Sequence, residues 1–599
     1  MSGHEQAVTA LERLIPEPAL VEIDAIDVAT APVATWERVR HGDLGGPPLI
    51  RALFALRTLP DRLRGEPGEI ALRLDDLASR PERPGFAILV DDPPREVAAG
   101  AIGEVWRRVI PFVHVDGAEA FASFDEPGQV KVAWAIRVSP GADGGSTVCM
   151  EVRVAATDAT SLRRFHRCFR LIGPGSRLVR RTLLAQLARD LGPRERTLPG
   201  DDLLDDAAQQ TTHSVAIAAP PERVWPWLVQ MGRGRGGFYS IDVFDNGGVR
   251  SARELHPEMA GIAVGDLIPI HPRSDAGFEV LAAEENRSLV LGGLWDADAG
   301  HQRPFAAPRP ARFWHATWSF ALEPLGAGST RLLVRTRLAF PPSGRVNPAW
   351  LRPAHNLMQA TQLRNLAARA EERLPANDWR DVLSGLAGVG RMGVSMLTPM
   401  QRSHRARWGA TPELLERRHP GDDLVAEPRW GWTHAVEVAA PPRRVWPWVA
   451  QVGADRGGFY SYSWLENLVG CALRDAERVH PEWELREGDD LRLHPSAPPL
   501  RVVSVEPGHH LVAFGAPDEE ARRAGRPWVA GSWLFLVEET APGLTRVVSR
   551  YRCATSDDVR TRLAFGPALL EPIGSTMDRR MLLGIRSRAE RAPRAVGRI

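Results

Sequence analysis

The sequence predicts an α+β protein built from three tandem modules, each a curved antiparallel sheet wrapped around one long C-terminal helix. Two observations lead to this prediction. The unusual string Gly236-Gly237-Phe238-Tyr239-Ser240 recurs 221 positions later as Gly457-Gly458-Phe459-Tyr460-Ser461, in a chain of 599 residues with only four tyrosines. Around both copies, the same order of strand, short helix, several strands and long helix is expected, and self-similarity at a fixed offset indicates a tandem array.

The repeat extends upstream of the string. Trp225-Pro226-Trp227 recurs as Trp446-Pro447-Trp448, and the lead-in Gly200-Asp201-Asp202-Leu203 recurs as Gly421-Asp422-Asp423-Leu424, again 221 positions later. Both full modules therefore begin with the same segment.

The amino-terminal third carries a fainter copy that lacks the string. Trp134 and Ser146-Thr147 resemble Trp318 and Ser329-Thr330, with one residue inserted between them. The predicted domains are a divergent module at 15–195, a full module at 200–374, a helical linker at 375–420 and a second full module at 421–592.

Each element of the 200–374 module follows from its local pattern. Val215 and Ile217 alternate with small residues as in a half-buried strand, and Pro220-Pro221 can open a helix. Within that helix, Pro226 is expected to cause a kink or to delay the start. Later strands are predicted at 266–270, 278–282, 288–292, 314–322 and 330–340, and terminal helices of the three modules at 178–191, 356–373 and 577–590.

A long antiparallel sheet that curls needs its concave face covered, and one amphipathic helix is the simplest cover. If the helix leaves part of the concavity unfilled, an apolar cavity remains between sheet and helix. Cavities of this kind are the usual form of small-molecule sites.

The strand, the Ala-Pro-Pro-x-x-Val-Trp-Pro-Trp helix at 219–227, the Gly-Gly-Phe-Tyr-Ser string and the closing helix resemble the START/polyketide-cyclase superfamily, SRPBCC, whose fold is called the helix grip. The resemblance is closest to tandem bacterial members of unassigned function. It implies an internal cavity for a hydrophobic ligand such as a lipid, a polyketide or another aromatic compound. It implies no particular reaction.

The repeated aromatic residues are the candidate ligand-binding residues, because they offer flat apolar surface and, at tyrosine and tryptophan, one polar group each. In this interpretation Tyr239 and Tyr460 orient the polar end of a ligand. The alternative is that the aromatic rings fill the core and hold the helix to the loop. The candidates are Trp225, Trp227, Phe238, Tyr239, Trp318, Phe320, Trp446, Trp448, Phe459, Tyr460, Trp533 and Phe535.

Three functions remain open. The favoured one is binding of hydrophobic small molecules without catalysis, because aromatic residues and glycines dominate the repeat and titratable residues are few. The second is a cyclase or dehydratase in which Tyr239 or Tyr460 is the general acid and His271 or His494 assists. The third is a protein-interaction scaffold, which filled cavities would favour.

Composition excludes several other classes. A net charge of +1, from 75 basic and 74 acidic residues, indicates neither a nucleic-acid nor an anionic-membrane partner. The apolar stretch at 382–396 is interrupted by Arg391 and is too short for a membrane span. Without a basic start followed by an apolar run, and with four sparse cysteines, a cytoplasmic protein is expected. No cofactor is indicated, and oligomeric state is left open.

The remaining polar motifs are given structural interpretations. His256, Glu258 and His271 do not have the spacing of a compact metal motif, so no metal site is predicted. Asp266 and Asp489 follow glycines and are expected to cap turns. The alternating arginines Arg331, Arg335 and Arg337, and their counterparts Arg546, Arg550 and Arg552, are expected on solvated convex faces.

Overall fold

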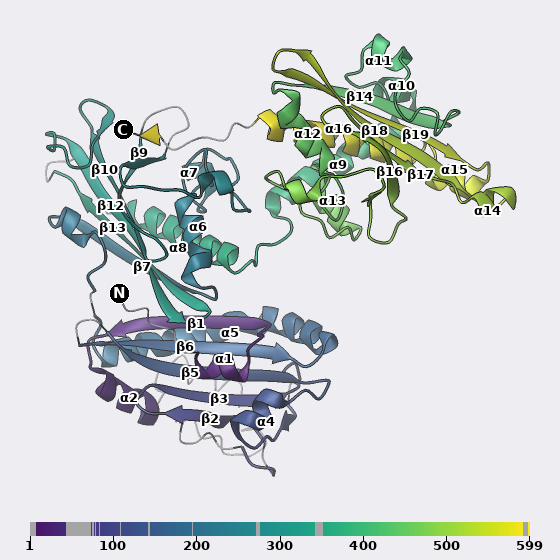
Figure 1. The fold of residues 1–599 in the computed structure, drawn as a ribbon. Coiled ribbons are helices and arrows are strands. Elements are labelled where there is room, and N and C mark those ends of the chain that lie inside the picture. Colours follow the sequence, from purple (N-terminus) through teal and green to yellow (C-terminus); the bar gives the residue numbers. More distant parts are fainter. Residues whose placement is uncertain are drawn as a thin grey trace. The chain divides into compact units, whose positions relative to one another are not determined.

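Three antiparallel sheets, each accompanied by helices, make up the part of the chain that the structure describes (Figure 1). In this computed structural model the described residues are 8–42, 74, 77, 79–82, 84–107, 109–141, 144–194, 196–270, 276–341, 351–590 and 597–598. They divide into two compact units, Met1–Arg373 with Ala595–Ile599, and Leu374–Arg594. The protein is therefore of the α+β class, as predicted.

The first sheet has the order β1-β6-β5-β3-β2, with β4 paired to β3. Its terminal helix α5 (Ala159–Asp190) begins well before the predicted start at residue 178. Asp158 caps the first turn by accepting hydrogen bonds from the backbone N–H groups of Thr160 and Ser161. The other elements are α1 (Ala10–Leu14), β1 (Leu20–Val28), α2 (Pro32–His41), β2 (Ala87–Asp92), β3 (Glu96–Gly103), β4 (Phe112–Val113), α4 (Gly117–Ser123), β5 (Val130–Pro140) and β6 (Ser146–Ala156).

The second sheet has the order β20-β8-β9-β10-β12-β13-β7, with β11 paired to β10. The five strands predicted here are present, and their bounds differ by a few residues at the ends. The elements are η2 (Asp201–Leu204), β7 (Gln209–Ile217), α6 (Pro221–Val229), α7 (Asp242–Asp245), η3 (Pro257–Met259), β8 (Asp266–Pro269), β9 (Gly277–Glu284), β10 (Ser288–Asp296), β11 (His301–Arg303), β12 (Phe313–Gly326), β13 (Ser329–Ala339), α8 (Leu351–Ala370) and β20 (Gly597–Arg598).

The third sheet has the order β14-β19-β18-β17-β16-β15, the same order as its counterparts in the second sheet. Its elements are α9 (Trp379–Leu397), η5 (Pro399–Gln401), α10 (Arg402–Arg405), α11 (Pro412–Glu416), β14 (Trp430–Val438), α12 (Pro442–Ala450), α13 (Ser463–Leu468), η6 (Pro481–Trp483), β15 (Asp490–Leu491), β16 (Leu500–Glu506), β17 (His510–Gly515), α14 (Glu519–Arg523), β18 (Val529–Ala541), β19 (Leu544–Thr555), α15 (Val559–Ala564) and α16 (Leu570–Glu590).

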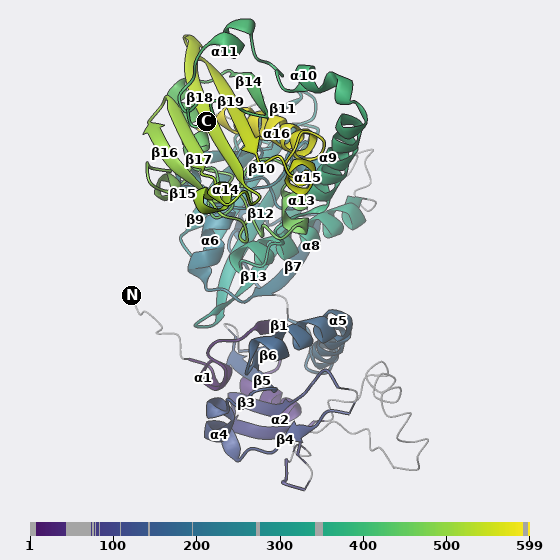
Figure 2. The ribbon, with the colours of Figure 1, turned by 90° about the vertical axis from the view of Figure 1, so that its right-hand side faces the viewer.

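The apolar linker segment forms α9, which lies beside α16 (Figure 2). Gly385 and Gly388 let this helix approach closely, since a Cβ atom at either position would lie 2.3 Å from Trp464 or 3.0 Å from Tyr462. The opposite face of α9 leaves Leu383 and Leu386 exposed. Within the described residues, no helix is long and apolar enough to cross a membrane.

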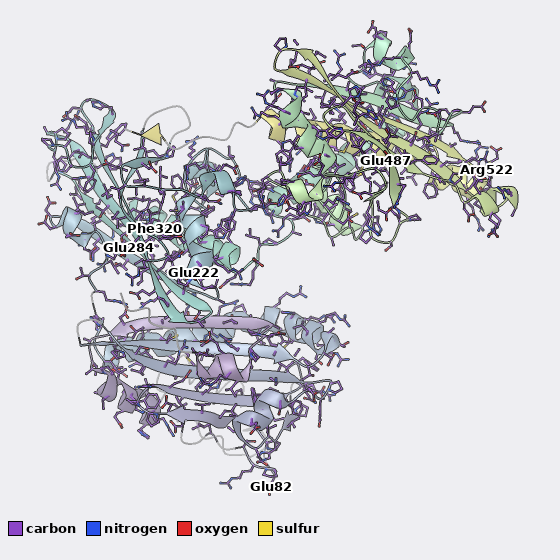
Figure 3. The ribbon with its side chains drawn as sticks, in the orientation of Figure 1. Glu82, Glu222, Glu284, Phe320, Glu487 and Arg522 are labelled. Atoms are coloured by element: carbon purple, nitrogen blue, oxygen red, sulfur yellow. The ribbon has the colours of Figure 1, made fainter. Side chains whose placement is uncertain are left out.

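We call the second sheet with α6, α7 and α8 the second module, and the third sheet with its helices the third module. In the second module the long helix α8 packs on one face of the sheet. Leu363 and Leu366 of α8 share a buried cluster with Val224 and Leu228 of α6 and with Phe320 of β12. Figure 3 labels Phe320. Helix α6 begins at Pro221 and continues through Pro226, so the alternative of a delayed start is wrong. The helix has only nine residues, so the missing backbone donor at Pro226 removes a single bond near its middle.

The expectation of solvated arginines on the convex faces is wrong. Arg331 and Arg335 are 6% and 4% exposed. Arg331 pairs with Asp27 at 2.7 Å, and Arg335 pairs with Asp201 of the lead-in. In the third module the lead-in Asp422 pairs in the same way with Arg550, at 2.8 Å. The lead-in aspartates neutralise Arg335 and Arg550, and Asp27 of β1 neutralises Arg331, so these arginines are paired where the alternation pattern alone assigns them to solvent.

Candidate functional site

The repeated string forms a tight loop whose backbone is fixed by short hydrogen bonds. Gly236 N–H donates to Gln230 O at 2.8 Å, and Gly237 pairs with Gly232 in an isolated bridge. Tyr239 and Tyr460 both adopt positive φ, 58° and 55°, a conformation that is uncommon outside glycine. The loop therefore turns each tyrosine ring in a direction that a regular strand or helix would not.

Each tyrosine ring lies between a tryptophan of the short helix and an arginine of the long helix. The Tyr239 ring meets Trp227 edge to face at 6.0 Å, and the Arg369 guanidinium lies 4.6 Å from its centroid. In the third module, Tyr460 contacts Trp448 at 5.9 Å and Arg588 at 4.4 Å. Both tyrosines are almost fully buried. These contacts join the short helix, the string and the long helix into one framework.

The rest of the string holds the long helix by polar contacts. In the second module, Ser240 Oγ donates to Met358 O at 3.0 Å, Gln362 Nε2 donates to Phe238 O at 2.9 Å, and Asn365 Nδ2 donates to Tyr239 O at 2.8 Å. Three successive residues of the string thus contact α8. These three hydrogen bonds fix where α8 lies against the string.

A cavity of about 410 Å³ lies beside this string in the second module. Aromatic rings of Phe238, Phe278, Trp314 and Trp318 form much of its wall, and α8 contributes the other side. Of the predicted ligand-binding residues in this module, Phe238 and Trp318 line the cavity. Trp225, Trp227, Tyr239 and Phe320 lie in the packed core and are not among its lining residues.

Polar groups at the inner wall of the cavity form a continuous chain. Trp318 Nε1 donates to Gln359 Oε1 at 3.2 Å, and Gln359 Nε2 donates to Gln362 Oε1 at 2.6 Å. Nearby, His355 Nε2 lies 3.2 Å from the Thr211 hydroxyl. Burial, together with neighbouring His213, lowers the pKa of His355, so its imidazole is neutral at pH 7.

One carboxyl group stands among the apolar lining. Asp245 of α7 lines the cavity next to Phe244, whose side chain is largely exposed and marks the outer rim. Burial raises the pKa of Asp245 to about 6, and the charge of Asp242 adds to the rise, whereas the Ser240 hydroxyl and Arg233 act in the opposite direction. This carboxyl group can therefore exchange a proton near neutral pH.

In the third module the predicted binding residues belong to a packed core. Trp446, Trp448, Phe459, Tyr460, Trp533 and Phe535 are all less than a tenth exposed and share one buried cluster. A second set of rings comes from β14 and β19. Trp432 stacks on Tyr551 with ring centroids 4.8 Å apart, and the Trp430 ring lies 5.5 Å from that of Tyr551. Beneath them, His434 Nδ1 lies 2.6 Å from Asp578 Oδ2, with both side chains buried.

The predicted histidine partners are not brought to the tyrosines in the described structure. His494 accepts a hydrogen bond from Ser496 N–H at Nδ1 and lies 3.0 Å from Val469 O through Nε2, so both ring nitrogens are occupied by backbone groups. His271 falls outside the described residues. His256 contacts Glu258 at 3.3 Å in an exposed pair.

The expected turn caps are confirmed. Asp266 accepts a hydrogen bond from Ala263 N–H at 2.8 Å, and Asp489 accepts one from Arg486 N–H at 3.0 Å.

Sequence reasoning missed the polar lining residues Asp245, His355 and Gln359. The repeat did carry a signal for the first of them. Asp245 lies six positions after Tyr239, and Glu466 lies six positions after Tyr460, so both modules place a carboxyl group at the same point beyond the string. Glu466 is 4% exposed, and burial raises its pKa to about 8, with Asp475 adding to the rise.

Comparison with solved structures gives neighbours of low similarity. The di-domain ARO/CYC BexL from the BE-7585A biosynthetic pathway is 13% identical, covers 64% of this chain and 99% of its own, and has a TM-score of 0.18. The Zhui aromatase/cyclase from Streptomyces sp. R1128 is 15% identical, covers 28% and 96%, and has a TM-score of 0.14. Protein MLL2253 from Mesorhizobium loti is 20% identical, covers 28% and 99%, and has a TM-score of 0.16.

The structural neighbours therefore include ARO/CYC proteins, but TM-scores this low carry no argument about function. No family model and no curated relative matches the chain.

Proposed function

We propose that the protein binds a hydrophobic small molecule in the cavity of its second module. The observation that supports this proposal most strongly is the cavity of about 410 Å³, which five aromatic side chains line. Small-molecule sites have volumes of about 300–1,000 Å³ and mostly apolar linings with a few polar groups. We also infer three helix-grip modules with bounds near 15–195, 200–374 and 421–592, of which the second keeps an open concavity.

The lining favours a flat ligand that carries polar atoms. Trp314 and Trp318 offer ring faces from β12, while Asp245 and Arg233 stand on the side of α7 and the string. Gln359 and His355 of α8 add further polar groups to the same lining. An aromatic compound that carries hydroxyl or carbonyl groups would match this mixture of rings and polar groups better than a single alkyl chain would.

Binding can be tested by calorimetry with 1-naphthol and palmitate as the aromatic and lipid probes. Thr336 lines the cavity and is replaced by tyrosine at the equivalent position of the third module, so Thr336→Tyr should fill the space. We expect the aromatic probe to bind the native protein and the control Thr336→Ser, and Thr336→Tyr to lose about tenfold or more in affinity. Equal binding by Thr336→Tyr would contradict the assignment.

A second candidate function is acid–base catalysis in the same cavity, and Asp245 is the observation that favours it. A general acid or base works best with a pKa near the working pH and within hydrogen-bond reach of the substrate. The raised pKa of about 6 meets the first requirement. In this function Asp245, and not Tyr239, would transfer the proton. Asp245→Asn should then abolish turnover of a bound aromatic substrate while leaving its affinity within a few-fold.

A further inference from the structure

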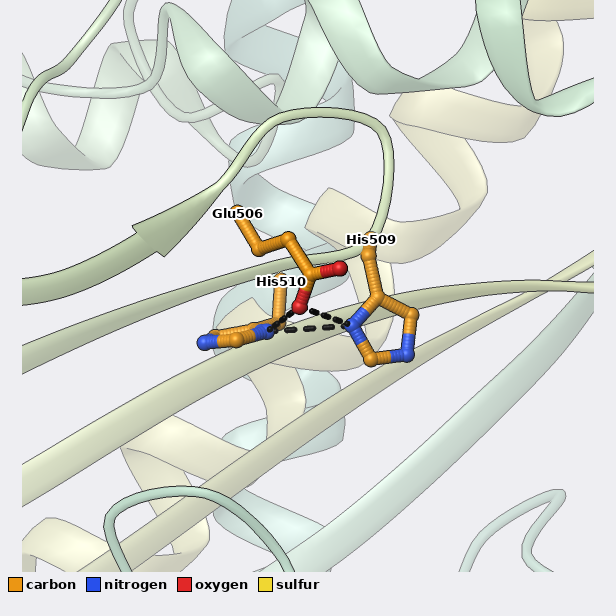
Figure 4. Close-up of side chains that lie close together, drawn as sticks. All are labelled: Glu506, His509 and His510. Carbon is orange, nitrogen blue, oxygen red and sulfur yellow. Dashed lines mark hydrogen bonds and ion pairs between the residues drawn. The ribbon is translucent and has the colours of Figure 1, made fainter.

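The hairpin between β16 and β17 carries a cluster that no part of the binding function uses. Glu506 and His510 are paired across the hairpin, and the turn is closed by a hydrogen bond from His509 N–H to Glu506 O at 2.9 Å. Gly508 supplies the positive φ of 81° that the turn requires. This tight turn brings all three side chains to one side of the hairpin end (Figure 4).

The three ligand atoms form a nearly equilateral triangle. His509 Nδ1 lies 3.1 Å from Glu506 Oε2 and 3.1 Å from His510 Nδ1, and His510 Nδ1 lies 3.4 Å from Glu506 Oε2 (Figure 4). Zinc binds imidazole nitrogen and carboxylate oxygen at about 2.0–2.2 Å in tetrahedral geometry, which separates neighbouring ligand atoms by roughly 3.3–3.5 Å. The triangle thus matches one face of a zinc coordination tetrahedron after a shift of a few tenths of an ångström.

The ring of His510 is already oriented for this role. Its other nitrogen, Nε2, lies 2.9 Å from the Ser504 hydroxyl, and its side chain is only 11% exposed. Histidines that bind metals usually donate their second ring N–H to an oxygen atom, which fixes the tautomer and directs the free lone pair at the ion. Ser504 can provide this contact. His509 and Glu506, at 45% and 64% exposure, leave the outer side of the triangle open to solvent.

The equivalent hairpin of the second module shows what the position holds without the histidines. There, Glu284 is paired with Ser288, and Arg287 N–H donates to Glu284 O at 2.9 Å, so the turn is the same. Arg287 forms an exposed ion pair with Glu284 at 3.6 Å (Figure 3 labels Glu284). In the third module His509 replaces Arg287 and His510 replaces Ser288. Glu506 therefore has no arginine of its own turn as an ion-pair partner.

We propose that Glu506, His509 and His510 form a binding site for a divalent transition-metal ion, with zinc as the best match. The ion takes the Nδ1 atoms of both imidazoles and one oxygen of Glu506, and its fourth position faces solvent, where water or a group from another molecule completes the coordination. The alternative is that the three groups are joined only by shared hydrogen bonds.

The test is zinc binding by the full-length protein and its variants, measured as metal per chain after dialysis against a low-micromolar zinc buffer. His509→Gln and Glu506→Gln change exposed side chains and should leave the melting temperature of the metal-free protein unchanged. Each should bind one zinc ion fewer per chain, or bind it about tenfold or more weakly. The matched control Arg287→Gln, in the second module's hairpin, should bind as the native protein does.

Cobalt substitution gives an independent readout. A four-coordinate cobalt ion at this site should produce visible absorption bands in the native protein and in Arg287→Gln, and these bands should be absent from His509→Gln. Equal zinc content in the native protein, His509→Gln and Glu506→Gln would overturn the proposal, because the metal would then belong to other residues. Absence of any bound zinc or cobalt in the native protein would overturn it as well.

Discussion

The second and third modules share one framework but differ in what fills the concave side of the sheet. In the second module a row across three strands reads Thr211, Thr336 and Trp318. In the third module, the same row reads Trp432, Tyr551 and Trp533. Thr336 and Trp318 border the cavity, whereas in the third module Trp432 stacks on Tyr551 and Trp533 meets Tyr551 edge to face.

Neighbouring positions have changed together with these rings. Gly531 stands where the second module has Ala316, and a Cβ atom at Gly531 would lie only 2.8 Å from the Tyr551 hydroxyl. Trp318 donates to Gln359 in the second module, while Trp533 donates to Ser549, which in turn donates to Asp578. The repeated residues therefore maintain the framework, and the residues that differ between the two copies change which side chains cover this face of the sheet.

The largest expected difference concerns the packed rings. Trp432→Ala should lower the free energy of unfolding of the Leu374–Arg594 unit by about 3–5 kcal/mol, because a buried ring leaves a void when removed. The matched change Thr211→Ala in the second module should cost less than about 1 kcal/mol. Urea unfolding, followed for each variant, measures both. Similar costs for the two changes would mean that the ring set is not part of the third core.

The buried carboxyl groups give a prediction on pH. Glu466 has a folded-state pKa of about 8, above its ordinary 4.5, so the unfolded chain releases this proton first as pH rises. Stability is then lost between pH 4.5 and 8, at about 1.4 kcal/mol for each pH unit.

Glu466→Gln should therefore raise the free energy of unfolding of the Leu374–Arg594 unit by about 3 kcal/mol at pH 7 and leave it unchanged at pH 4. Asp245→Asn should act over a lower and narrower range, ending near pH 6, since the pKa of Asp245 is raised less. Unfolding free energies at several pH values give the comparison. A stability curve of Glu466→Gln parallel to that of the native protein would rule out a protonated Glu466.

A smaller effect is expected where the long helix contacts the string. Gly584 and Asn365 occupy equivalent places, and a Cβ atom at Gly584 would lie 2.3 Å from Tyr460 O. Gly584→Ala should cost about 1–3 kcal/mol through overpacking. Asn365→Ala, which removes the bond to Tyr239 O, should cost about 1 kcal/mol. Thermal unfolding of both variants measures the two costs. A cost for Gly584→Ala no larger than that for Asn365→Ala would contradict closer packing of the long helix in the third module.

The sequence was sufficient for the strands and the short helix of the second module, because alternation and proline position are local signals, but it missed the first half of the terminal helix α5. The prediction for the arginines was wrong, because alternation distinguishes the two faces of a strand but cannot reveal that the lead-in segment and β1 place aspartates against one of them. The orientation of the Tyr239 ring could not be predicted from the sequence either. The positive φ turns the ring toward Trp227 and Arg369, and that turn depends on the loop around Gly236 and Gly237.

Native mass spectrometry of the protein incubated with an aromatic probe tests the central claim most directly. The open cavity of the second module predicts one bound molecule per chain, retained by Thr336→Ser and lost in Thr336→Tyr. Loss of the bound molecule in Trp432→Ala, or equal occupancy in the native protein and Thr336→Tyr, would contradict the account, because binding would then not depend on the second-module cavity.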